Sequence, residues 1–182
     1  MAQTSLYFIA ILPDKQTSKW IRTLQEEMCS LFGVCKAMRT PPHITIVPPF
    51  QYREDTEYRL IQAFHQISFA PFDLPIEGLG RFGKQVIFVK PEVIDSLESL
   101  YRNAQEQVKN LIAIEKQKSF HPHFTIGYRD LAPVFLNAWK HFEAQEIPIT
   151  AHIEKMVLFK HQDKRWQILT KIFDKSLENF NE

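Results

Sequence analysis

A short phrase that occurs twice constrains this chain more than any other feature of its sequence. Residues 42–46 read Pro-His-Ile-Thr-Ile and residues 122–126 read Pro-His-Phe-Thr-Ile, so four of the five positions are identical and the fifth is apolar in both copies. In a β-strand, residues two apart share a face while their neighbours point to the opposite face. Each copy is therefore predicted to form a strand with a buried apolar back and a front that carries one imidazole and one hydroxyl.

Two such fronts that face each other would form a pocket from His43, Thr45, His123 and Thr125. The structural alternative is that each strand carries a half-buried histidine whose ring is hydrogen-bonded and inert. For a single His-x-Thr this alternative is favoured, because so short a pattern arises easily by chance. The matched pair, with its shared proline and apolar frame, instead favours a functional site.

The four side chains suit chemistry at a phosphate. Histidine has an unperturbed pKa of about 6.5, so it can both accept and donate a proton near neutrality. One histidine would take a proton from an attacking water or hydroxyl, and the other would give a proton to the departing oxygen. The threonine hydroxyls would donate hydrogen bonds to the non-bridging oxygens, where negative charge develops. This arrangement requires no cofactor and no metal.

Composition narrows the class of protein. With 182 residues, of which 45% are hydrophobic, the chain can bury a sizeable core as a single domain over residues 1–182 built from two lobes. The net charge of +1 gives no indication of binding to a long polyanion, so any contact with nucleic acid should be local. Two cysteines are too few for a disulfide framework or a cysteine-rich zinc site. No stretch reads as a membrane span or a signal peptide, and a cytoplasmic protein is expected.

Apolar periodicity predicts an alternation of strands and helices. Strands are expected at residues 5–12, 43–47, 72–79, 85–90, 121–128, 147–159 and 165–173. Helices are expected between Asp14 and Gly33, at 55–68, from Pro91 to about residue 111, and at 133–145. Each half of the chain thus contains two helices, one His-x-Thr strand and further strands. This order predicts a two-lobed α+β fold with pseudo-twofold character, in which the motif strands meet at a central cleft.

The two motifs resemble those of the two-histidine (2H) phosphoesterases, the superfamily that includes 2′-5′ RNA ligases and cyclic nucleotide phosphodiesterases. His-Ile-Thr-Ile at 43–46 and His-Phe-Thr-Ile at 123–126 both fit its His-Φ-Thr/Ser-Φ pattern, where Φ is apolar. The opening strand at residues 6–13 and the Phe-His-Pro-His sequence at 120–123 are also similar to family segments. The resemblance therefore covers nearly the whole chain.

This resemblance implies a bilobal α+β fold in which two antiparallel sheets flank a central cleft, with helices on the outside. It also implies metal-independent action on 2′,3′-cyclic phosphate or 2′-5′ phosphodiester linkages of RNA or nucleotides. One position departs from the family pattern, because many relatives carry Arg before Pro-His whereas this chain has His121. His121 should share a face with His123, and it is a candidate substrate contact whose charge depends on pH.

Further candidate contacts lie near the motifs in the sequence. Arg39 precedes the first motif and Arg129 follows the second, and both are candidates for positive charge near the cleft. A nucleoside could stack on an aromatic side chain such as Tyr7, Phe50 or Tyr128. The histidines at positions 65, 141, 152 and 161 are interpreted as exposed polar residues on surfaces or at a turn.

A literal Gly-x-Gly-x-x-Gly at residues 78–83 is a competing signal. A dinucleotide-binding fingerprint needs a helix directly after the glycines, to receive the pyrophosphate. Residues 84–89 instead have a strand pattern, so a hairpin turn is predicted. A metal pair at His121 and His123 is not predicted either, because no nearby Cys, Asp or Glu completes a ligand set.

The sequence therefore predicts a phosphoesterase in which His43 and His123 are the catalytic acid and base, and Thr45 and Thr125 bind the phosphate. Its partners would be RNA ends or small nucleotides with a cyclic phosphate, with no membrane and no obligatory protein partner. The direction of reaction, and the histidine that acts as base, do not follow from the sequence. The alternative function is an RNA-end or nucleotide-binding module that keeps the pocket but turns over little.

Overall fold

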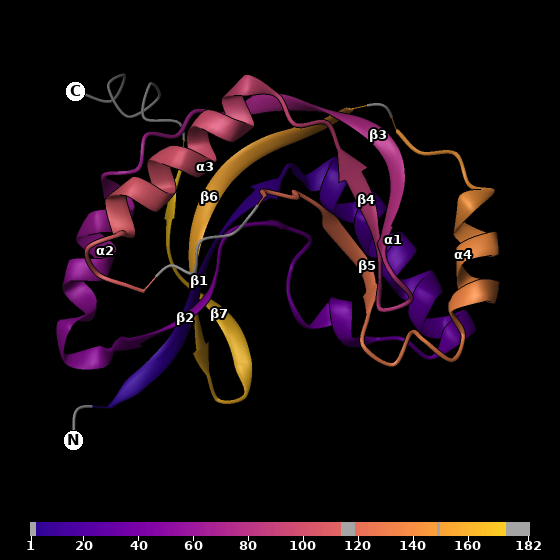
Figure 1. Cartoon of the computed structure of the whole chain (residues 1–182), viewed down its shortest axis with the longest axis horizontal. Helices are drawn as coiled ribbons and strands as arrows, with labels where there is room; N and C mark the ends of the chain where they lie inside the picture. The colour runs from indigo at the N-terminus through magenta and orange to yellow at the C-terminus, as the bar shows by residue number, and fades with distance from the viewer. Residues whose placement is uncertain (1–2, 114–118, 149, 174–182) are drawn as a thin grey trace.

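A computed structural model describes residues 3–113, 119–148 and 150–173 of the chain (Figure 1). These residues form seven antiparallel strands, six of which follow the order β2-β1-β6-β3-β4-β5, while β7 pairs with β6. The strands are β1 (Thr4–Pro13), β2 (Ile44–Arg53), β3 (Phe72–Phe82), β4 (Val86–Pro91), β5 (Phe124–Tyr128), β6 (Thr150–Gln162) and β7 (Arg165–Ile172). The helices are α1 (Lys15–Phe32), α2 (Glu57–His65), α3 (Asp95–Val108) and α4 (Phe135–Glu143), with short 3₁₀ helices η1 (Lys36–Arg39) and η2 (Glu54–Thr56).

The long strand β3 belongs to two sheets. Its first part, as far as Pro75, pairs with β6, and the part that begins at Ile76 pairs with β4. The change of partner coincides with a register shift at Gly78, whose φ of 139° lies in a region that side-chain-bearing residues rarely adopt. One sheet therefore contains β2, β1, β6, β7 and the start of β3, and the other contains the rest of β3, β4 and β5. The predicted α+β fold with two antiparallel sheets is confirmed.

The two motif strands occupy equivalent places in this architecture. β2 lies at one end of the strand order and β5 lies at the other, so each is an edge strand. In both motifs the apolar residues are buried, with Ile44, Ile46, Phe124 and Ile126 at most 1% exposed. The alternation predicted from the repeat is therefore present, and it turns the histidine and threonine side chains of each motif to the opposite face.

The helices cross between the two halves of the chain. α1 follows the first strand but contacts β5, whereas α3 follows β4 but contacts β2. α2 packs beside α3, and Figure 1 shows this pair on one side of the molecule with α1 and α4 on the other. Each motif strand is thus backed by a helix from the other half of the chain. Among the described residues, no helix is long and apolar enough to cross a membrane.

Local signals place α1 as predicted. The side chain of Asp14 accepts a hydrogen bond from the backbone N–H of Thr17 at 2.7 Å, which caps the helix, and Gly33 ends it in the left-handed conformation with φ 71°. The apolar spacing also predicts Leu31 on the inward stripe. Its side chain is instead 57% exposed, and the next residue, Phe32, packs against the core in the last turn of α1.

Prolines account for two corrections to the predicted boundaries. β2 continues through Pro48 and Pro49 as far as Arg53, because an edge strand tolerates residues without an N–H and the β1–β2 register shifts at this point. Pro91 does not open α3. It ends β4 opposite Ile76, and α3 begins at Asp95.

Other boundaries differ by a few residues. The second motif strand begins at Phe124, directly after the histidine, and α2 begins at Glu57 after the η2 turn. The hairpin is formed by β6 and β7, but position 149 of its predicted first strand lies outside the described residues. The Gly-x-Gly-x-x-Gly segment forms the end of β3 and the following turn, as predicted, and leads into β4.

A buried ionic cluster attaches α2 to the sheet. Lys160 of β6 has a side chain only 8% exposed, and its Nζ lies 2.7 Å from Glu57 Oε2 and 3.2 Å from Glu54 Oε1. The Tyr7 hydroxyl donates to Glu57 Oε2 at 2.6 Å, and the Ser5 hydroxyl donates to Glu54 Oε1 at 2.6 Å. Because each buried charge has an opposite charge and a hydrogen bond, the cluster satisfies the requirement for burial.

Replacing Lys160 by Met should destabilise the fold by about 2 kcal/mol, below the roughly 3–5 kcal/mol of a fully enclosed pair, because the carboxylates keep some contact with water. Met preserves the apolar stem but leaves Glu57 without its cation. Urea unfolding measures the loss, and Lys155→Met, which removes a more exposed lysine of the same strand, is the matched control. Equal stability of the two variants would contradict a structural role for the cluster.

Candidate functional site

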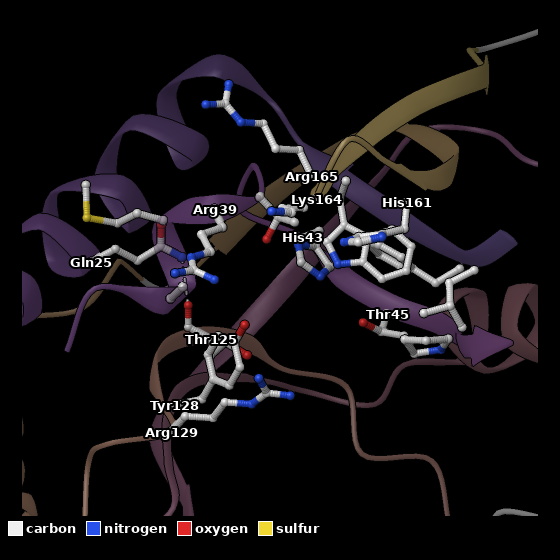
Figure 2. Close-up of a pocket in the computed structure, with 17 residues that line it drawn as sticks. Gln25, Arg39, His43, Thr45, Thr125, Tyr128, Arg129, His161, Lys164 and Arg165 are labelled. Carbon is white, nitrogen blue, oxygen red and sulfur yellow. Dashed lines mark hydrogen bonds between the residues drawn. The ribbon is translucent and has the colours of Figure 1, made fainter.

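A cavity of about 970 Å³ lies between β1, η1, the two motif strands and the β6–β7 hairpin (Figure 2). Its apolar lining includes Phe8 from β1 and Trp166 from β7. The polar and charged side chains that line it are Gln25, Arg39, Thr40, His43, Thr45, Thr125, Tyr128, Arg129, His161, Lys164 and Arg165. The cavity therefore brings His43, Thr45 and Thr125 together with Arg39 and Arg129. His123, His121 and Tyr7 are not among its lining residues.

His43 is held against an aromatic floor. Its ring centroid lies 5.3 Å from that of Phe8 and 6.1 Å from that of Phe159, and these two phenyl rings stack on each other at 4.5 Å. The Nδ1–H of His43 donates to the backbone carbonyl of Pro41 at 2.7 Å. A carbonyl can only accept, so this bond places the proton of the neutral ring on Nδ1 and leaves Nε2 with a lone pair.

His123 repeats this arrangement. Its ring centroid lies 5.1 Å from those of both Phe82 and Phe88. Its Nδ1–H donates to the carbonyl of His121 at 2.8 Å, again two residues before the histidine. In both copies a buried proline separates the histidine from the accepting carbonyl. Because proline fixes φ, it helps to hold that carbonyl beside the ring, which is a role beyond starting a strand.

Burial keeps both imidazoles neutral. The pKa of His43 is lowered to about 4, mainly because burial disfavours the charged ring; the bond to the Pro41 carbonyl opposes this shift, and the charge of His123 adds to it. The pKa of His123 is also lowered, again mainly by burial.

The cavity wall is strongly basic. Arg39, Arg129, Lys164 and Arg165 line it, and no Asp or Glu is among its lining residues. Lys164 has left-handed backbone with φ of 62°, because it forms the two-residue turn between β6 and β7 together with Asp163, whose φ is 50°. Arg129 also has left-handed backbone, with φ of 52°, in the segment that follows β5. A wall of this charge favours an anionic ligand.

η1, which supplies Arg39, is fixed from several directions. A disulfide joins Cys29 at the end of α1 to Cys35 just before η1, so the two cysteines are paired although they are too few for a framework. Arg22 donates to the carbonyl of Thr40 at 2.8 Å, and Lys36 pairs with Asp130 after β5. The wall that carries Arg39 is thereby tied both to α1 and to the second motif strand.

Tyr7 and His121 lie apart from the cavity. Tyr7 is fully buried, and its hydroxyl donates to Glu57, which removes it from the candidate contacts in this structure. His121 is exposed; its Nε2 hydrogen-bonds the Ser119 hydroxyl at 2.6 Å, and its ring lies 6.3 Å from that of Phe82. Phe82 therefore contacts the rings of both His121 and His123, but His121 does not line the cavity.

Sequence reasoning missed the contribution of the β6–β7 hairpin. The sequence alone indicates a plain exposed residue at His161, yet this histidine lines the cavity together with Lys164, Arg165 and Trp166. The run Lys-Arg-Trp at a predicted hairpin tip was the available signal, since basic residues next to an aromatic suit a nucleotide. Gln25 was also missed, and its signal was a polar residue on the apolar stripe of α1.

The other histidines connect elements of the fold. His141 of α4 hydrogen-bonds Glu27 of α1 at 2.7 Å, and His152 of β6 pairs with Asp73 of β3 at 2.7 Å. His65 of α2 hydrogen-bonds Thr170 of β7 at 3.0 Å. Over the described ranges, no group of three His, Cys, Asp or Glu side chains is placed to hold a metal ion.

Comparison with known proteins identifies relatives over most of the chain. The family model described as the 2′-5′ RNA ligase superfamily matches residues 13–165. An RNA 2′,3′-cyclic phosphodiesterase of Archaeoglobus fulgidus is 23% identical over 124 residues, which cover 66% of this chain and 70% of the relative. A putative phosphoesterase of Geobacillus kaustophilus is 23% identical over 169 residues, which cover 89% of this chain and 92% of the relative.

Solved structures share the fold of this chain. Escherichia coli LigT in complex with 3′-AMP superposes with a TM-score of 0.65 at 17% identity, covering 95% of this chain and 99% of LigT. A protein of Thermus thermophilus superposes with a TM-score of 0.64 at 18% identity, covering 92% of this chain and 97% of that one. At these identities the superpositions show the fold.

The depressed pKa of His43 gives a direct test of its environment. The ring should titrate near pH 4 in the folded protein, against about 6.5 in the unfolded chain. The folded protein then binds fewer protons between these values, so stability should fall as the pH decreases from about 6.5 through about 4. NMR titration of the imidazole signals measures the first effect, and urea unfolding of the native chain and of His43→Gln across this pH range measures the second. A titration midpoint of the His43 imidazole near pH 6.5 would contradict the burial of this ring against Phe8 and Phe159.

Gly80 should be essential for the floor under His123. It faces Phe88 across β3 and β4, and a Cβ at this position would overlap the Phe88 ring. Gly80→Ala should therefore cost about 1–3 kcal/mol and shift the ring signals of His123. Gly127→Ala is the matched control, because its Cβ would meet the flexible side chain of Met28 at 3.0 Å and leave Phe88 untouched. Unchanged His123 signals in Gly80→Ala would show that Phe88 does not position this ring.

Proposed function

We propose that this chain, which belongs to the 2′-5′ RNA ligase superfamily, is a phosphoesterase that acts on 2′,3′-cyclic phosphate or 2′-5′ phosphodiester linkages of RNA or nucleotides. The observation that carries the proposal is that His43 and His123 share the same local arrangement. Each ring rests on two phenylalanines and donates its Nδ1–H to the carbonyl two residues earlier. Each therefore offers Nε2 for proton transfer, as two-histidine acid–base catalysis requires.

Because burial keeps the ring of His43 neutral, its Nε2 is available to act as the base in hydrolysis. A water attacks the phosphorus of the cyclic phosphate, and Nε2 of neutral His43 takes its proton as the new P–O bond forms. The bond from phosphorus to one ribose oxygen breaks, and protonated His123 gives its Nε2 proton to that oxygen. A bound phosphate raises the pKa of His123 toward the protonated form, because its negative charge favours the imidazolium. In the reverse, ligating direction the two roles exchange.

The remaining groups of the cavity suit a negatively charged transition state. Thr45 and Thr125 line the cavity from the two motif strands, where their hydroxyls can donate to the non-bridging oxygens. Arg39 and Arg129 add positive charge to the same wall. RNA ends and nucleotides fit this wall better than neutral esters, because every such ligand carries phosphate next to an aromatic base that Tyr128 or Trp166 can stack on.

One observation favours a second candidate, a binding module for RNA ends or nucleotides with little turnover. His43 and both threonines line the cavity, but His123 does not. A pocket that presents only one of the two motif imidazoles can bind phosphate without the second motif histidine supplying a proton to the leaving oxygen. Many relatives have arginine where this chain has His121, and arginine is always charged. Histidine at this position therefore provides less fixed positive charge beside the second motif.

Hydrolysis of 2′,3′-cyclic AMP and of an oligoribonucleotide with a 2′,3′-cyclic end, measured in EDTA, separates the candidates. His43→Ala and His123→Ala should each lower kcat/KM by roughly a hundred- to ten-thousand-fold, because each removes one proton transfer. His152→Ala removes an exposed histidine that pairs with Asp73 and is the matched control. Retained turnover in either catalytic variant would overturn the two-histidine mechanism, and binding without turnover by the native protein would favour the module.

A further inference from the structure

Gln25 is a polar residue in an apolar position. It lies on the face of α1 that also carries Ile21, Leu24 and Met28, all buried, and its own side chain is only 3% exposed. Leucine or methionine would fit this row without the need for a hydrogen-bond partner. The presence of a buried amide therefore requires an explanation from the groups that it meets.

One half of this amide has a clear partner. Its Nε2 donates to the backbone carbonyl of Thr125 at 2.8 Å, the bond marked by the dashed line in Figure 2. Because β5 is an edge strand, no strand of the described residues supplies donors to the side of its backbone that faces away from β4. Gln25 supplies one at the residue that turns its hydroxyl to the cavity. Since a carbonyl can only accept, this bond also fixes which end of the amide is the nitrogen and which is the oxygen.

The other half has no partner. Oε1 of Gln25 is buried and accepts no hydrogen bond from any described residue. A buried acceptor without a hydrogen bond destabilises the ligand-free protein. A donor that reaches this oxygen when a ligand fills the cavity would explain why the chain keeps it. Gln25 lines the same cavity as the two motifs, so the missing donor should come from this cavity.

Several donors line the cavity, and Arg39 is one that has no partner of its own among the described residues. It lines the cavity, it is exposed, and it has no hydrogen bond or ion pair within the described residues. Figure 2 shows its guanidinium directed toward the same part of the cavity as the Gln25 amide. A guanidinium has five N–H donors in a planar fork, so it can bind a phosphate and donate to a neutral acceptor at the same time.

We propose that Gln25 is a positioning residue that accepts a hydrogen bond from Arg39 when a phosphate occupies the cavity. Gln25 would then connect Arg39, which precedes the first motif, to Thr125 of the second motif. Arg39 would contact the anion directly, while Gln25 would act only through Arg39 and Thr125. The inference rests on the proposed function for its ligand, a nucleotide phosphate, but it needs binding and not turnover.

A double-mutant cycle tests the connection. The native protein, Gln25→Met, Arg39→Met and the double variant are titrated with 3′-AMP by calorimetry, and the same proteins are assayed with 2′,3′-cyclic AMP. Each single variant should weaken 3′-AMP binding about tenfold, because each removes a hydrogen bond to a charged group. The double variant should bind no more than about threefold more weakly than Arg39→Met, since Gln25 has nothing to position once the guanidinium is gone.

Gln105→Met is the matched control. Gln105 lies on α3 and donates from Nε2 to the carbonyl of Ile46 in the first motif strand at 3.4 Å, yet it does not line the cavity. This variant should bind 3′-AMP like the native protein. Melting temperatures of all variants verify folding, and Gln25→Leu is a second substitution that suits the apolar row should Gln25→Met unfold.

The outcomes separate the inference from the proposed function. Additive losses, with the double variant about a hundredfold weaker, would overturn it and would indicate that Gln25 contacts the ligand directly. Native affinity in Gln25→Met would also overturn it. A native protein that binds 3′-AMP but does not hydrolyse the cyclic nucleotide would contradict the proposed function while the binding cycle still decides the role of Gln25.

Discussion

Both His-x-Thr strands lie at the ends of the strand order, and the rest of the structure depends on this placement. An edge strand leaves half of its backbone hydrogen-bonding groups without a strand partner. Here, glutamine side chains from helices supply donors on those edges, Gln25 for β5 and Gln105 for β2. Within the described residues, no further strand covers the outer edges of β2 and β5. The residues just before each of these strands, which include His43 and His123, can therefore approach the cleft.

The aromatic floors are the second common element of the two motifs. Each histidine is packed against two phenylalanines that come from neighbouring strands, and each donates to a carbonyl two residues earlier. Burial then favours the neutral imidazole, while the carbonyl decides which nitrogen is free. The environments are nevertheless unequal, because His43 opens into a basic cavity whereas His123 is bordered by Phe82 and the exposed His121. Of the two motif histidines, only His43 therefore combines its aromatic floor with a place in the basic cavity.

Local periodicity explains what the sequence could predict. The alternation in each motif placed Ile44 and Phe124 in the core, and the capping residues Asp14 and Gly33 marked both ends of α1. These features depend on neighbours in the sequence, so they are visible without a structure. The family resemblance, carried by the two motifs, agrees with the match to the 2′-5′ RNA ligase superfamily over residues 13–165.

What the sequence could not predict depends on distant contacts. Tyr7 and Phe8 belong to one continuous apolar run, and only the packing of both faces of β1 shows that Phe8 lines the cavity while Tyr7 meets Glu57. The prolines at 48 and 49 could continue β2 because that strand is an edge, a property of the whole sheet. The basic hairpin tip follows the second motif by about forty residues, and nothing in its local pattern indicates that it folds over the first motif.

The crossing of the helices has a consequence for how the chain reaches this state. α1 covers a strand that is about a hundred residues later in the sequence, as the bond between Gln25 and Thr125 shows, and α3 returns to a strand that precedes it by about sixty. Neither half of the chain contains both a motif strand and the helix that backs it. The halves must therefore assemble together, and folding has to close long loops before either motif gains its support, which slows folding relative to a protein of local contacts. During synthesis, α1 would emerge well before β5 and would have to await the strand that it covers.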